Sequence, residues 1–308
     1  MKVLVAGGTG FIGQALIQHF LNQSYEVIVL TRRFLLKPVC YPNKVTFVSW
    51  DGKTCGDWVT YLEGVDVVIN LAGARITPFF FLNFIKKKIL DSRVLSTQAL
   101  VDAISFVDTK PTLFIQASAV GFYPFHQEGG EACTEQSGRG EGFLSEVCER
   151  WESVANLASQ EKVNVVIIRL GIVFSETGGF LKLLMSNIRF YMGFVCGSGS
   201  QMISWVSLKD VVLGIDFLMT KTSYHGVLNL VSPHPLSLSE LMRQFCSLLH
   251  RPLLFRIPSF FFRFIFKEAA SFFIKGHLVS CHQLLSLGYQ FHDLNFNQWI
   301  DSYLEKKI

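Results

Sequence analysis

Short apolar runs alternate with longer stretches of helical period over the first 230 residues of this 308-residue chain. The runs consist almost entirely of Val, Ile and Leu, which is typical of parallel strands that helices cover on both faces. We therefore expect buried strands at Lys2–Ala6, Glu26–Leu30, Val45–Ser49, Asp66–Asn70, Thr112–Ala117 and Asn164–Arg169.

Apolar residues three and four apart predict helices between these strands, at Phe11–Asn22, Asn83–Ser105 and Gly142–Ser159. In the third segment one face carries the apolar side chains Leu144, Val147, Trp151, Val154 and Ala158. Alternating strands and helices with right-handed crossovers predict an α/β fold, a doubly wound parallel sheet of the Rossmann type.

The regular alternation becomes weaker after residue 170. Gly178-Gly179 predicts the start of a helix, and the charge-free run Phe190–Leu208 is expected to be a loop because glycines and serines interrupt it. A last helix and strand are expected at Leu208–Met219 and Val227–Leu230. Prolines 233 and 235 then mark a boundary, after which the pattern predicts several helices.

Composition narrows the class of protein. Hydrophobic residues make up 50% of the chain and charged residues 17%, which excludes a disordered protein and raises the question of a membrane span. The run Phe190–Leu208 is too rich in glycine to be a spanning helix of about 20 apolar residues. Gly7-Gly8 interrupts the first apolar stretch too early for a signal peptide. We expect no transmembrane segment and a cytoplasmic location.

Charge and cysteine usage argue against two further classes. The net charge of +4 is small and scattered, so no nucleic-acid partner is expected, and small molecules are the expected partners. The seven cysteines include no Cys-x-x-Cys pair and are expected to be reduced thiols. His277, Cys281 and His282 could share a helix face, but a fourth ligand is missing nearby, so we predict no metal site.

A glycine-rich turn stands between the first predicted strand and the first predicted helix, with the sequence Gly7-Gly8-Thr9-Gly10-Phe11-Ile12-Gly13. In a dinucleotide-binding turn the first glycine permits the tight bend, the second lets the backbone approach a pyrophosphate, and the third allows close packing of helix and strand. The helix amides and dipole then favour the phosphate charge. The expected cofactor contacts are Gly7, Thr9, Gly10, Phe11, Ile12 and Gly13.

The end of the second strand discriminates between the two nicotinamide cofactors. NAD enzymes usually place Asp or Glu there, whereas this chain has Thr31, Arg32 and Arg33. A guanidinium can hold a 2′-phosphate through two hydrogen bonds, so we favour NADP(H) over NAD(H), although a solvated basic loop is the alternative. Asp51 is expected at the adenine edge. The inner ribose is expected beside Asn70, Leu71, Ala72 and Gly73.

Further motifs extend this pattern along the chain: Ala117-Ser118-Ala119-Val120-Gly121-Phe122-Tyr123, Arg169-Leu170-Gly171-Ile172-Val173 and Ser204-Trp205-Val206-Ser207-Leu208-Lys209-Asp210. With the glycine turn they resemble the extended short-chain dehydrogenase/reductase superfamily nearly end to end. Asp91-Ser92-Arg93 and residues 143–152 are similar to its epimerase-family group, whose members are labelled nucleoside-diphosphate-sugar epimerases. The resemblance adds Arg93 to the expected cofactor contacts.

The superfamily's chemistry uses a Tyr-x-x-x-Lys pair on the helix after the fifth strand and a Ser or Thr at the end of that strand. Ser118 matches the serine, but Phe143 and Val147 stand where the tyrosine and lysine are expected, and neither can exchange a proton. Tyr123 is the nearest phenol in sequence, and Glu146 is the nearest ionisable group on the helix. Ser118 and Tyr123 are the catalytic candidates.

Two function hypotheses follow from these features. The first is an NADP-dependent oxidoreductase or epimerase-like enzyme for an unidentified small substrate, and the second is a sensor that holds NADP(H) without turnover. We predict an NAD(P)-binding domain over residues 1–232, with residues 178–204 on its substrate side, and a small helical substrate domain over 233–308. A homodimer is compatible with the sequence.

A third, weaker hypothesis concerns the aromatic and basic segment Phe260–Lys275. Its phenylalanines and cations could form a helix at a membrane surface and make the protein a membrane-peripheral regulator. Packing of the phenylalanines on a neighbouring part of the protein is the commoner arrangement.

Overall fold

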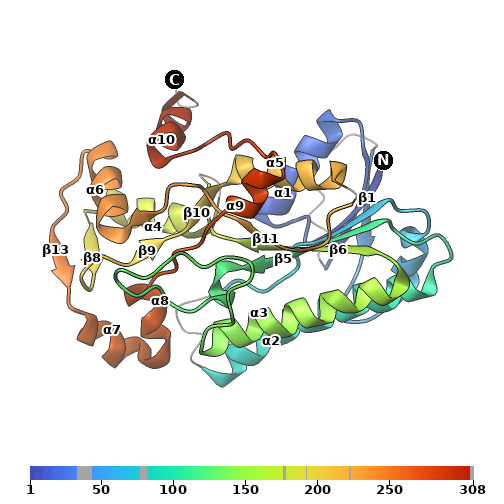
Figure 1. Ribbon diagram of the computed structural model, residues 1–308, viewed down its shortest axis with the longest axis horizontal. Helices are drawn as coiled ribbons and strands as arrows, with labels where there is room; N and C mark the ends of the chain where they lie inside the picture. The colour runs from blue at the N-terminus through green and yellow to red at the C-terminus, as the bar shows by residue number, and fades with distance from the viewer. Residues whose placement is uncertain (33–43, 77–81, 176–177, 192, 222, 306–308) are drawn as a thin grey trace.

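A computed structural model describes residues 1–32, 44–76, 82–175, 178–191, 193–221 and 223–305. Its centre is a seven-stranded sheet of order β11-β6-β5-β4-β1-β2-β3, in which every neighbouring pair is parallel (Figure 1). The strands are β1 (Lys2–Ala6), β2 (Glu26–Thr31), β3 (Val45–Ser49), β4 (Val67–Asn70), β5 (Leu113–Ala119), β6 (Asn164–Leu170) and β11 (Gly226–Leu230). The predicted doubly wound Rossmann-type sheet is confirmed.

Helices cover both faces of the sheet. Alternate residues of β1 divide between two apolar cores, with Val3 and Val5 in one and Leu4 and Ala6 in the other. The helices packed on the first core are α1 (Phe11–Asn22) and α5 (Leu208–Thr220), and those on the opposite face are α2 (Asn83–Phe106) and α3 (Phe143–Asn156) (Figure 1). α3 is shorter than predicted because the chain continues from Leu157 to Glu161 as a 3₁₀ turn, η3. A second such turn, η1 (Asp57–Leu62), precedes β4.

The segment after β6 forms short strands that the sequence did not predict. It contains β7 (Ile172–Phe174), α4 (Gly179–Arg189), β8 (Phe194–Cys196), β9 (Met202–Ile203) and β10 (Trp205–Ser207). The expectation of a loop over 190–208 is therefore wrong. Each short strand is stabilised by a partner distant in sequence, namely β7 for β10, β12 (Leu236–Ser237) for β9 and β13 (Phe255–Ile257) for β8. Local composition cannot show such tertiary pairing.

The chain after Pro233 is mostly helical, as predicted. Its helices are α6 (Leu238–Leu248), α7 (Ser259–Phe266), α8 (Ser271–Ile274), α9 (His282–Ser286) and α10 (Phe296–Glu305), with a 3₁₀ turn, η4, at Lys267–Ala270. α6 begins with a capping box, in which Ser237 accepts from the amide of Glu240 and the Glu240 carboxylate accepts from the amide of Ser237. Among the described helices, none is both long and apolar enough to cross a bilayer.

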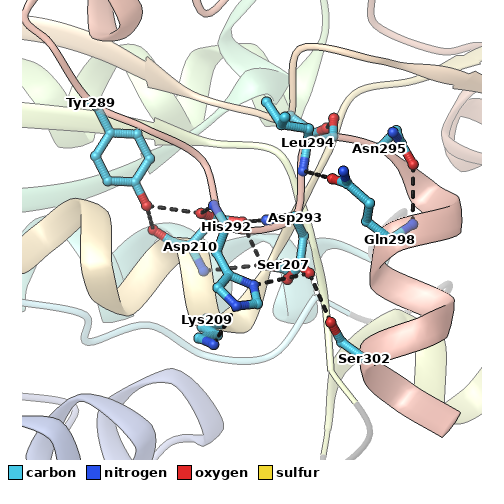
Figure 2. A network of polar contacts seen from close by, with 11 residues as sticks. Ser207, Lys209, Asp210, Tyr289, His292, Asp293, Leu294, Asn295, Gln298 and Ser302 are labelled. Atoms are coloured by element: carbon cyan, nitrogen blue, oxygen red, sulfur yellow. Dashed lines mark hydrogen bonds and ion pairs between the residues drawn. The ribbon is translucent and has the colours of Figure 1, made fainter. Parts of the chain in front are cut away.

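A buried carboxylate joins the last part of the chain to the sheet domain (Figure 2). Asp210, in the first turn of α5, is fully buried and accepts hydrogen bonds from the Tyr289 hydroxyl at 2.9 Å and the backbone amides of His292 and Asp293 at 2.7 and 2.9 Å. Burial and this carboxylate raise the pKa of Tyr289. Val279 and Leu284 belong to the same apolar core as β1. The two predicted domains thus share a core, and the boundary at residue 233 stays a prediction.

Candidate functional site

The glycine turn has a backbone shape that other residues would disturb. Gly7 has a φ of +81°, and its carbonyl accepts from the amide of Gly10 at 2.9 Å. A Cβ on Gly7 would lie 2.7 Å from the carbonyl carbon of Leu71, and one on Gly13 would lie 2.5 Å from the Cα of Gly8. Both distances are shorter than real Cβ contacts, so glycine at position 7 is needed for the approach of the turn after β4, and glycine at position 13 for the close packing of α1 on the glycine turn.

The N-terminus of α1 is open to an anion. Gly10 precedes the helix and has no side chain to cap it, and the first turn contains no acidic residue. The first helical amides, including those of Phe11 and Ile12, have no acceptor within the helix, and the helix dipole adds positive potential there. Thr9 is exposed beside them. Both the geometry and the charge of this end suit a phosphate group.

The end of β2 places a cation next to this turn. Thr31 is buried, whereas Arg32 is exposed, with its side chain lying over Gly52. Although burial opposes its charge, hydrogen bonds from Thr54 and Lys53 hold the pKa of Asp51 below its usual value. The Asp51 carboxylate is therefore ionised and bound to its own turn. Arg33 lies outside the described residues.

Asn70 fixes the turn that follows β4. Its side chain is fully buried, donates to Thr97 Oγ1 and Gln116 Oε1 at 2.9 Å each, and accepts from the amide of Ala72 at 3.0 Å. These bonds hold the backbone of Leu71 against Gly7. The residues predicted to contact the inner ribose are thus brought beside the glycine turn.

Arg93 closes the same region from α2. Its guanidinium lies close to Gly73, stacks 5.1 Å from the Trp151 ring centroid, and donates to the carbonyls of Ala74 and Ile89. Burial lowers the pKa of Arg93. Its cationic group lines the cavity described next.

A cavity of about 590 Å³ opens at the carboxyl ends of β5 and β6. It runs from Ala119 and Leu170, at the ends of those strands, to Phe194, Met242 and Phe273 in the later part of the chain. Most of its lining is apolar. Its size and its position beyond the strand ends are typical of ligand sites in open α/β sheets.

Phe143 and Val147 both line this cavity from successive turns of α3. The positions that resemble the superfamily's tyrosine and lysine therefore share one side of the helix and face the cavity. Phe143 lies beneath the amine of Lys86, which is 5.3 Å from its ring centroid. Val147 is buried. The two positions supply packing and no titratable group.

Ser118 belongs to a buried polar network next to the cavity. Its hydroxyl donates to Glu152 Oε1 at 2.6 Å. Glu152 in turn accepts two hydrogen bonds from Arg169, at 2.9 and 2.7 Å, and both of these side chains are buried. The Ser118 hydroxyl is thus oriented toward the ion pair.

Tyr123 contacts the same network and lines the cavity. Its hydroxyl donates to Asn229 Oδ1 at 2.7 Å and accepts from Arg169 at 2.9 Å. Burial raises the pKa of Tyr123, although Arg169 and Asn229 act in the opposite direction. Glu146 is paired with Arg150 at 2.6 Å and is absent from the cavity lining. The catalytic assignment of Ser118 and Tyr123 stays a prediction.

Cys148 and His277 also line the cavity, and the sequence had suggested only a metal-ligand role for His277. His277 stacks on Phe125 and has Nδ1 3.2 Å from the carbonyl of Pro124, and burial lowers its pKa. Cys148 is buried next to Val147, and burial raises the pKa of its thiol to about 11. These residues come from distant elements, and a single His or Cys gives little signal in sequence. No cluster of three potential metal ligands occurs among the described residues.

Comparisons with known proteins identify the relatives of this chain. A model of the NAD dependent epimerase/dehydratase family matches residues 3–230. The chain belongs to this family. It is 34% identical over 293 residues to an Arabidopsis thaliana protein named epimerase family protein SDR39U1 homolog, chloroplastic, covering 94% of this chain and 83% of the relative. It is 31% identical to the epimerase family protein SH2119 of Staphylococcus haemolyticus, with 96% of both chains covered.

A solved structure matches the fold over almost its whole length. The crystal structure of human epimerase family protein SDR39U1 (isoform2) with NADPH aligns with a TM-score of 0.83 and 27% identity, covering 96% of each chain. This family assignment agrees with the resemblance drawn from the glycine turn and the later motifs.

Proposed function

We propose that this epimerase-family chain binds NADP(H) and uses it in an oxidoreductase or epimerase-like reaction on a small substrate. The observation that carries the proposal is the uncapped N-terminus of α1, which glycines hold close to β1 and which Arg32 accompanies at the end of β2. The NADPH in the crystal structure of the human relative supports the choice of cofactor.

The described residues fit this cofactor. The amides of Phe11 and Ile12 would hold the pyrophosphate, and glycine at position 10 would let it approach the backbone. Arg32 would hold the 2′-phosphate, because Asp51, which precedes the Gly52 that the Arg32 side chain covers, is engaged by its own turn. The proposed contacts also include Thr31 and the expected residues after β4 and on α2, which are Asn70, Leu71, Ala72, Gly73 and Arg93. Arg33, outside the described residues, is proposed from the sequence alone. When bound, the cofactor supplies hydride transfer.

The cavity would hold the substrate. Its apolar side chains exclude water, and Arg93 and His277 offer polar contacts in its wall. In this proposal the sheet domain, residues 1–232, binds the cofactor, and residues 178–204 and 233–308 enclose the substrate. We also propose a cytoplasmic location and a homodimer for this chain. The Arabidopsis relative, in contrast, bears the word chloroplastic in its name.

A sensor that holds NADP(H) without turnover is the second candidate. It is favoured by Phe143 and Val147, which fill the proton-transfer positions of the superfamily with side chains that cannot titrate. It is also favoured by Ser118 and Tyr123, since the hydroxyls of both donate within the protein. The two candidates share the cofactor site and differ only in the chemistry at the cavity.

The test of the cofactor proposal is calorimetric titration of NADPH and NADH into the wild type and Arg32→Ala. A charge-assisted contact is worth about 1.5–3 kcal/mol, so the variant should bind NADPH roughly 10- to 150-fold more weakly and NADH almost unchanged. Lys44→Ala removes an exposed cation before β3, at the amino ends of β2 and β3 and so at the opposite end of the strands from Arg32, and should change neither affinity. Equal losses for the two cofactors, or a wild type that prefers NADH, would refute the assignment.

A further inference from the structure

Helix α7 has two apolar faces, and only one of them is covered. Its inner face packs Phe262 and Phe266 on Phe273, with ring centroids 5.5 and 4.9 Å from Phe273. On this face the phenylalanines pack on a neighbouring part of the protein, which is the commoner of the two arrangements that the sequence allows. The outer face has a different environment.

The outer face of α7 consists of large side chains in water. Phe264 is 85% exposed, Phe260 61%, Ile265 54% and Phe261 48%. Spacings of one, four and five residues place these four side chains on one continuous stripe of the helix. We call Phe260, Phe261, Phe264 and Ile265 the α7 stripe. In β13, which leads into α7, Phe255 and Leu254 before it are also more than half exposed.

Basic residues accompany the stripe. Residues 254–275 contain four cations, Arg256, Arg263, Lys267 and Lys275, and a single acid. All four cations are exposed. Arg263 lies between the two halves of the stripe in sequence, and Lys267 follows at the end of the helix. Arg263 and Lys267 form no ion pair with a described carboxylate.

We propose that the α7 stripe docks on an anionic lipid membrane, with its phenylalanines in the interface and Arg256, Arg263 and Lys267 on the lipid headgroups. The positive charge beside the stripe favours an anionic surface as the partner. A two-fold dimer through the same face would bring the cations of one copy against those of the other, which disfavours a second copy. An amphipathic segment of aromatic and basic residues binds anionic interfaces by apolar burial and attraction together.

The position of α7 would place a docked membrane next to the cavity. Figure 1 shows α7 and α8 at the end of the molecule away from β1. Phe273, which supports the inner face of α7, also lines the cavity, as do Ser271 and Lys275 nearby. The docked helix would therefore sit directly above one wall of the mainly apolar cavity. Docking does not depend on the proposed function, because the stripe lies outside the cofactor site.

The test is sedimentation of the whole protein with vesicles of phosphatidylcholine alone and of phosphatidylcholine with 30% phosphatidylglycerol. We expect at least tenfold stronger binding to the anionic vesicles and a marked decrease in 0.5 M NaCl, since screening weakens the attraction. Phe264→Ser should weaken binding about tenfold. Phe106→Ser is the matched control, because Phe106 is 70% exposed at the end of α2 and should leave binding unchanged.

Arg263→Glu combined with Lys267→Glu should remove the preference for anionic vesicles and retain the melting temperature. NADPH binding and thermal unfolding of every variant show whether the fold is intact. The proposal is overturned if the wild type does not bind anionic vesicles, or if Phe264→Ser binds as the wild type does. It is also overturned if light scattering shows a dimer that Phe264→Ser dissociates, since a second copy would then cover the stripe.

Discussion

The carboxyl ends of the strands carry two regions that recognise ligands by different means. In the cofactor region, around Gly7 and Gly13, the backbone itself forms the site, and side chains would obstruct it. In the region around α3, side chains form the cavity wall, and the two positions expected to carry chemistry are Phe143 and Val147.

This difference shows which features of a site tolerate substitution. A residue with a Cβ at Gly13 must displace the backbone of the turn, so the position tolerates little change. A phenylalanine or valine in the cavity wall still packs, so the chemistry of α3 can be lost or changed while the fold persists. The sequence therefore constrains the cofactor region more tightly than it constrains the reaction.

The largest effect is expected from a substitution in the cofactor region. Gly13→Val should abolish measurable NADP(H) binding, because even its Cβ would lie 2.5 Å from Gly8 Cα and 2.6 Å from the carbonyl of Gly7. Circular dichroism should show a folded chain, and calorimetry gives the affinity. Gly138→Ala is the matched control, since a Cβ there meets nothing within 4 Å. Wild-type affinity in Gly13→Val would mean that the turn does not serve a nucleotide.

The next effect tests the buried ion pair beside the cavity. Glu152→Ala leaves Arg169 buried without its carboxylate and should lower the free energy of unfolding by about 3–5 kcal/mol. Urea unfolding measures the loss. Glu149→Ala removes an exposed glutamate of the same helix, paired with Arg139, and should cost less than about 0.5 kcal/mol. Similar losses in both variants would show that the buried pair has no special role in stability.

The smallest of these effects is expected from substitutions beside the cavity, and it tests whether the cavity carries chemistry. If the chain is an enzyme, Ser118→Ala with Tyr123→Phe should lower NADPH oxidation by about 10²-fold, the usual scale of general acid catalysis, while NADPH affinity stays nearly constant. The assay is a screen over carbonyl and sugar-nucleotide compounds. Tyr224→Phe is the control, because its hydroxyl bonds to the carbonyl of Val227 away from the cavity lining.

The double variant separates the two candidate functions. Turnover that persists in it would show that Ser118 and Tyr123 are not the proton-transfer groups. Absence of turnover in the wild type, with NADPH still bound, would favour the sensor. Failure of NADPH binding in the wild type would instead contradict the cofactor proposal itself.

The sequence by itself determined the elements whose signals are local. β1, α1 and β3 have the predicted bounds, because hydrophobic periodicity and the glycine turn act within a few residues. The glycine turn and Arg32 also predicted a nucleotide site, since its shape follows from the backbone conformations that glycine permits. The mostly helical character after Pro233 was likewise visible.

Only the tertiary structure decided which distant residues meet. β8, β9 and β10 form because β13, β12 and β7 complete their hydrogen bonds, and these partners are too distant in sequence for a local pattern to reveal them. Arg169 was a single charge in an apolar strand, and its pairing with Glu152 on α3 became apparent only when the helix packed on the sheet. Hydrogen bonds and burial depend on such contacts, so the environments of Ser118 and Tyr123 could not be read from their neighbours in sequence.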